Sequence, residues 1–181
     1  WSRPAGLLAA LHMLRAAGAQ VGLMDCLDRA WSPEFWPKAH PTGKGPYLKT
    51  PLPQPAALKG VPRRFSRYGH HPETVREALR RLSPEPDLVL VTTVMTYWYP
   101  GAAEAVRMAR EIWPEAPVVL GGIYATLCPE HAAGLGADLV LAGRLEDPPA
   151  WTKLWRVLGR DAPALPRGAG LELALGLSPD P

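Results

Sequence analysis

Cysteine is scarce in this sequence, and long apolar runs are missing from it. The 181 residues include two cysteines, Cys26 and Cys128, which cannot build a disulfide scaffold. Their wide separation favours free thiols in a reducing, cytoplasmic compartment. No apolar run approaches the roughly 18 residues that a membrane-spanning helix needs, so the sequence predicts no membrane segment.

An excess of charge of one sign is also lacking. The 20 basic and 17 acidic side chains leave a formal charge of +3, which is not typical of a nucleic-acid-binding protein. Residues 59–81 form a local exception with a net charge of +5. Phosphate or nucleic-acid binding is one interpretation of this stretch. A solvated face, or a surface for a partner domain, is the interpretation we favour.

Phosphate-binding motifs are missing as well. No GxGxxG motif and no P-loop lysine follows a predicted strand, which argues against a dinucleotide or nucleoside triphosphate site. Cys128 and His131 have the spacing of one metal-ligand pair, but no second pair accompanies them. We therefore interpret this stretch as a helix start. The sequence offers no nucleophile–base or acid–base pair to support a stand-alone enzyme.

Proline is plentiful and unevenly placed. Of 22 prolines, eight lie in residues 31–66 and six in residues 147–181. Prolines at this density forbid long helices and central strands. The remaining residues, about 110, are too few for a (β/α)₈ barrel.

Helical and strand patterns alternate through the rest of the chain. We expect helices over 4–17, 72–82, 100–113 and 149–158, a short helix from Pro129, and strands over 20–25, 87–93, 117–120 and 138–142. The nearly continuous apolar strands are typical of a parallel sheet buried on both faces. The sequence therefore predicts an α/β fold with a doubly wound, mostly parallel sheet, whose ligands bind at the carboxyl ends of the strands.

The segment after the 87–93 strand carries the strongest functional signal. Hydroxyls, Met95 and three consecutive aromatic residues, Tyr97–Tyr99, follow the strand directly. Such a segment suits a large flat ligand with polar edges, because rings stack on it and hydroxyls bond its rim. Alternatively, Tyr97 and Trp98 cover the sheet edge. Gly121-Gly122 ends the next strand and would let a ligand approach the backbone.

Four stretches together resemble a known family. They are Trp1–Pro4 before a Leu-rich helix, VLVTTVMTYWYPG at 89–101, VVLGGIYATLCPE at 118–130 and ADLVLAGRLE at 137–146. They look like the N-terminal cobalamin (vitamin B12)-binding domain of the cobalamin-dependent radical S-adenosylmethionine enzymes. The resemblance implies a Rossmann-like, flavodoxin-like fold that holds the corrin ring over the strand ends. The implied cofactor-binding residues are Thr93, Met95, Thr96 and Tyr97, which would meet the corrin or the tail, together with Trp98. Gly121, Gly122 and Ile123 would line the tail channel, and Gly143 and Glu146 would close the far side.

The sequence departs from related patterns in two places. Other cobalamin domains carry Asp-x-His-x-x-Gly before the first helix, and here Trp1 and Arg3 stand where Asp and His would be if Gly6 is that glycine. We expect the lower face of the cobalt to receive no histidine, and to be open, hydrated or covered by Tyr97 or Trp98. The three cysteines of a radical enzyme's four-iron cluster are also missing. We therefore expect the cluster and S-adenosylmethionine only in a further domain, and three closely spaced cysteines after Pro181.

This resemblance implies a domain plan and a function. Residues 1–158 would form the cobalamin-binding domain with a Pro-rich insert at 31–66, and residues 159–181 a linker. The first strand would be missing, which leaves four strands and either a gap or a makeshift pairing beside Leu88–Thr93. The chain would position cobalamin for methyl or electron transfer in a larger enzyme, for example a methyltransferase, whose radical domain is its partner. The alternative is a non-enzymatic docking domain that no longer binds cobalamin.

Overall fold

The computed structural model describes residues 5–28, 46–62 and 64–166. The predicted helix start at 2–4, the first part of the Pro-rich insert and the tail from 167 lie outside these ranges. The chain divides into two compact units: Met24–Leu82 is one, and Trp1–Leu23 with Ser83–Pro181 is the other.

The larger unit contains a three-stranded parallel sheet. Its strands are β3 (Val89–Thr92), β4 (Val118–Gly121) and β5 (Leu139–Val140), in the order β3-β4-β5. Val89 pairs with Val118 in the first ladder, and Leu120 with Val140 in the second. Five α-helices accompany this sheet: α1 (Ala5–Ala16), α3 (Tyr99–Ile112), α4 (Ile123–Leu127), α5 (Pro129–Ala133) and α6 (Pro148–Val157). This confirms the predicted α/β class and its parallel sheet.

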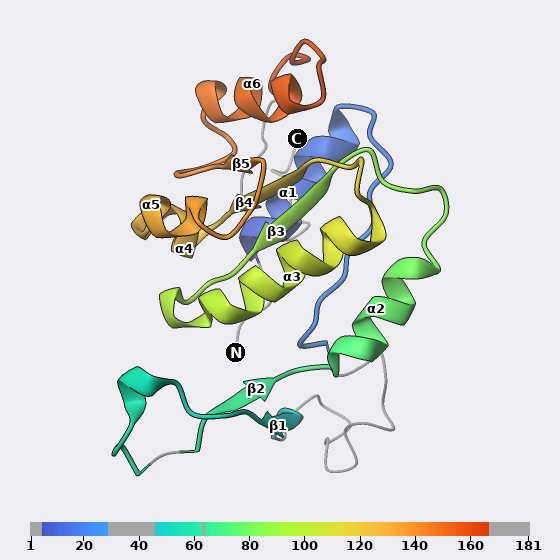
Figure 1. Cartoon of the computed structure of the whole chain (residues 1–181). Helices are drawn as coiled ribbons and strands as arrows, with labels where there is room; N and C mark the ends of the chain where they lie inside the picture. Colours follow the sequence, from blue (N-terminus) through green and yellow to red (C-terminus); the bar gives the residue numbers. More distant parts are fainter. Residues whose placement is uncertain (1–4, 29–45, 63, 167–181) are drawn as a thin grey trace, which may run out of the picture. The chain divides into compact units, whose positions relative to one another are not determined.

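Helices cover both faces of the sheet. Successive strand side chains point to opposite faces. Val119 of β4 packs with Met13 of α1 and Trp151 of α6, whereas Val118 packs with α3 and Leu120 packs with α3, α4 and α5. In Figure 1, α3 crosses the front of the sheet and α1 lies behind it. With both faces covered by helices, the loops of this unit lie at the ends of the strands.

The prediction of a strand over residues 20–25 is wrong. These residues are irregular, and Val21 packs against the core cluster of α1, α6 and Val119. Within the described ranges, β3 pairs with β4 and no strand lies along its other edge, so this sheet has three of the four expected strands. An extended apolar segment forms a strand only where a neighbour takes its backbone hydrogen bonds. Here the apolar pattern reflects packing.

The smaller unit has short elements, as its prolines require. Strands β1 (Lys49–Pro51) and β2 (Ser66–Tyr68) pair antiparallel, and η2 (Ala56–Leu58) is a single 3₁₀ turn between them. Helix α2 (Pro72–Arg80) begins at a capping histidine, since His71 Nδ1 accepts a 3.4 Å hydrogen bond from the Glu73 amide.

The residues after α6 pack on the larger unit. Trp151 Nε1 donates a 2.8 Å hydrogen bond to the Pro163 carbonyl, and Ala162 and Leu165 lie against the cluster around Val119. The core of the larger unit therefore includes residues after α6, as far along the chain as Leu165. No helix in the described part of the chain is long and apolar enough to cross a bilayer.

Asp138, the residue before β5, links the start of β4 to helix α3. Its Oδ2 accepts a 2.7 Å hydrogen bond from the Val118 amide, and its Oδ1 lies 2.8 Å from Arg110 Nη2. The hydrogen bond from Val118 is the largest influence and lowers the pKa of Asp138 below its usual value of 3.8. Desolvation opposes it, and the hydrogen bond and charge of Arg110 lower the pKa further.

We expect Asp138→Asn to lower the free energy of unfolding at neutral pH by about 1 kcal/mol, a modest loss because this ion pair is well exposed to solvent. A lowered folded-state pKa stabilises the fold above the usual pKa, and this is lost as the pH falls through the lowered value. The wild-type advantage in urea denaturation should therefore shrink below pH 3.8. Asp161→Asn, at an exposed position, is the control. Equal destabilisation by Asp138→Asn at neutral pH and below pH 3.8 would contradict this role.

Candidate functional site

The carboxyl ends of β3, β4 and β5 meet at one edge of the sheet. The strands are parallel, so the loops that follow them lie side by side there. The loop after β3 contacts α4, because the Tyr124 amide donates a 3.5 Å hydrogen bond to the Thr93 carbonyl. Thr93 was predicted for the site from the sequence, and Tyr124 was not.

Gly122 holds the closest approach between two of these loops. Its φ of 90° and ψ of −168° belong to a backbone region that glycine alone adopts readily. A Cβ at this position would lie 2.2 Å from Thr92 Oγ1. At Gly121 the nearest atom would be the Leu141 carbonyl oxygen at 3.8 Å, an ordinary contact. The two glycines therefore differ: Gly122 is required by the fold, whereas a Cβ at Gly121 would fit in ordinary contact with Leu141.

Large apolar side chains are exposed along this edge. Tyr97 is 64% exposed, Ile123 53% and Met95 38%. Exposed large apolar side chains that gather at a ligand-binding edge mark a binding surface. Val94, Tyr99 and Leu127 of the same segments are exposed as well.

The remaining predicted residues occupy three places. Thr96 and Trp98 begin and end η3 (Thr96–Trp98), where both are half-buried, and the Trp98 ring meets Tyr97 edge-to-face at 6.0 Å. Gly143 has a φ of 92° in the loop after β5. Glu146 lies further along that loop and is paired with Arg144 at 3.5 Å. The structure thus brings the residues after β3 and β4 together, while the ion pair of Glu146 with Arg144 lies within its own loop.

A hydroxyl that was not among the predicted site residues connects two loops. Thr126 Oγ1 donates a 2.8 Å hydrogen bond to the Gly122 carbonyl and accepts one of 2.9 Å from the Gly143 amide. The only sequence signal was its place within the GG-x-x-A-T stretch, which gives no hint of a partner 17 residues away.

An aromatic cluster lies beneath the edge. Tyr124 is buried, its hydroxyl is 2.6 Å from His131 Nδ1, and the ring of Tyr99 meets His131 edge-to-face at 4.7 Å. Burial raises the pKa of the Tyr124 phenol. Cys128 directly precedes α5, so the predicted helix start is confirmed. In the described ranges, no three His, Cys, Asp or Glu side chains are grouped so as to hold a metal ion.

Comparison with known families matches this part of the chain to one of them. Residues 64–150 match the family model of the B12 binding domain. The match covers just under half of the chain and includes every site residue predicted from the sequence. Neither a search of curated proteins nor a search of solved structures found a match.

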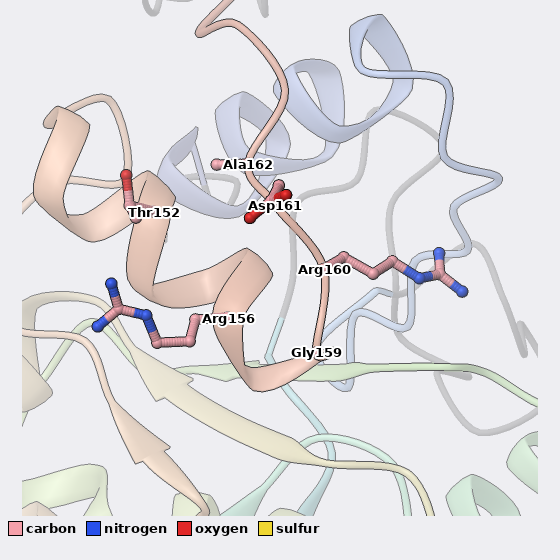
Figure 2. A pocket seen from close by; sticks show the side chains of 6 residues that line it. All are labelled: Thr152, Arg156, Gly159, Arg160, Asp161 and Ala162. Atoms are coloured by element: carbon pink, nitrogen blue, oxygen red, sulfur yellow. The ribbon is translucent and has the colours of Figure 1, made fainter.

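A shallow hollow lies in the segment that follows the B12-binding match. It measures about 190 Å³ and is lined by Thr152, Arg156, Gly159, Arg160, Asp161 and Ala162. Figure 2 shows the two arginine side chains pointing in opposite directions. Because these guanidinium groups do not converge on a common point, the hollow lacks the focused polar groups of a ligand site.

We expect Gly122→Ala to lower the free energy of unfolding by about 3 kcal/mol, since it adds backbone strain and a contact with Thr92. Gly101→Ala is the matched control, because a Cβ at Gly101 of α3 would have no neighbour within 4 Å. It should stabilise the helix by about 0.5–1 kcal/mol. Urea denaturation of both variants tests this, and an unchanged midpoint for Gly122→Ala would contradict it.

Proposed function

We propose that the strand-end surface binds cobalamin, and that the chain is a cobalamin-binding module. One observation carries the proposal: exposed Met95, Tyr97 and Ile123 lie at the carboxyl edge of the sheet, inside the segment that matches the B12 binding domain. A corrin is a large, mostly apolar ring with amide groups on its rim. Apolar side chains with nearby hydroxyls and backbone groups fit such a ligand.

Each loop has its own part in this proposal. Thr93, Met95, Thr96, Tyr97 and Trp98 would contact the corrin from the loop after β3. Gly121, Gly122 and Ile123 would line the path of the nucleotide tail. The lack of a side chain at Gly121 supports this, because bare backbone lets a ligand approach closely. Gly143 and Glu146 would close the far side.

We further propose that the module serves a radical S-adenosylmethionine domain of the same polypeptide. The support is the resemblance of four sequence stretches to such enzymes. When bound, cobalamin supplies a cobalt centre that carries a methyl group or an electron. The residues of this chain would hold the corrin, orient it and exclude water from one face. With only Cys26 and Cys128 in this sequence, the iron–sulfur cluster would be bound by other residues.

Titration of the full chain with hydroxocobalamin, followed by absorbance and by retention on a desalting column, tests the binding. We expect a changed corrin spectrum and co-elution with the protein. Ile123→Glu should weaken binding at least tenfold, because bound cobalamin would bury the new charge.

Thr152→Glu is the matched control, since it adds the same charge at an exposed position of α6, on the other face of the sheet. It should bind as the wild type does. A folded wild-type chain that leaves the corrin spectrum unchanged would favour the docking alternative.

The lower face of the cobalt gives a second test. The strand-end loops, residues 93–98, 121–123 and 141–147, contain no histidine, and His131 Nδ1 is already hydrogen-bonded to Tyr124. We therefore expect that the cobalt(II) form, bound to nitrogen-15-labelled protein, shows no nitrogen-15 splitting in its electron paramagnetic resonance spectrum. Label in the protein alone separates a histidine from the cofactor's own base. A nitrogen-15 splitting would refute the expectation.

A further inference from the structure

Thr126 occupies the point where two strand-end loops meet. It lies on the last turn of α4, near the protein surface. A threonine hydroxyl has one proton to donate and lone pairs to accept with. Here the hydroxyl donates a hydrogen bond to the Gly122 carbonyl oxygen and accepts one from the Gly143 amide. The side chain thus bridges the loop after β4 and the loop after β5.

Both loops depend on glycine conformations that need support. Gly122 and Gly143 have φ values of 90° and 92°. A Cβ at Gly143 would touch little, with Asp147 Oδ2 at 3.7 Å as its nearest neighbour. Packing around Gly143 is therefore open, and the hydrogen bond to Thr126 is what connects it to α4. Without this bond, the backbone at Gly143 would be free to move away from Gly122.

We infer that Thr126 is a positioning residue, which fixes the spacing of these two loops and thereby the affinity for corrinoids that carry a nucleotide tail. The inference rests on the proposed function, in which the tail passes beside Gly121–Ile123 and Gly143. The corrin ring itself would lie on the β3 loop, around Met95 and Tyr97. A change in the spacing of the β4 and β5 loops should therefore affect the tail much more than the ring, because a binding site tolerates little displacement of its supporting groups.

Two substitutions separate the hydroxyl from the shape of the side chain. Thr126→Val keeps the branched shape and removes both hydrogen bonds, whereas Thr126→Ser keeps the hydroxyl. Each full-length variant is titrated with hydroxocobalamin and with cobinamide, a corrinoid without the nucleotide tail. We expect Thr126→Val to weaken cobalamin binding about tenfold, to leave cobinamide binding within about twofold of wild type, and Thr126→Ser to bind both as wild type does.

Hydrogen exchange in the ligand-free chain gives an independent readout. The Gly143 amide should exchange faster in Thr126→Val than in the wild type, and at the wild-type rate in Thr126→Ser. Equal losses for cobalamin and cobinamide, or unchanged affinity for both, would overturn the inference while the proposed function stands. A wild-type chain that binds neither corrinoid would overturn both.

Discussion

The central strand β4 packs against helices on both of its faces, and this double burial sets the place of the other elements in the larger unit. Val118 and Leu120 are fully buried on the side of α3–α5, and Val119 is almost fully buried on the side of α1 and α6. Burying a side chain of this kind contributes about 1.5–3 kcal/mol. Because both faces of β4 are covered, the chain can leave this strand only at its ends, and it turns at the carboxyl edge. That edge is where the loops collect.

The loops at this edge combine a fixed backbone with exposed apolar side chains. The backbone is held by the close approach of Gly122 to Thr92 and by the hydroxyl of Thr126. Tyr97 and Ile123 stay exposed above it. A rigid backbone reduces the ordering cost when a ligand binds, and exposed rings provide area to bury. This combination, together with the B12-binding match, is what makes the edge the candidate cofactor surface.

Several features were predictable because local pattern and tertiary packing agree. The alternation of apolar strands and helices gave the parallel sheet, and Tyr97 and Ile123 were placed at the correct edge. The strand expected at Val21–Met24 fails because strand formation depends on a pairing partner, which an apolar run does not encode. The Thr126 bridge could not be predicted, because its partner Gly143 is distant in the sequence. The cluster of Tyr124 and His131 was missed because it depends on how α4 and α5 pack.

The sequence by itself determined the α/β class, the helices α1, α2, α3, α5 and α6, and the glycine pair after β4. These follow from periodicity and from backbone sterics, which act over a few residues. Only the tertiary structure decided which glycine is required by the fold and which would accept a Cβ. It also decided which hydroxyl joins the loops, and whether residues 20–25 form a strand. These features depend on atoms that are distant in the chain and meet only when the sheet has formed.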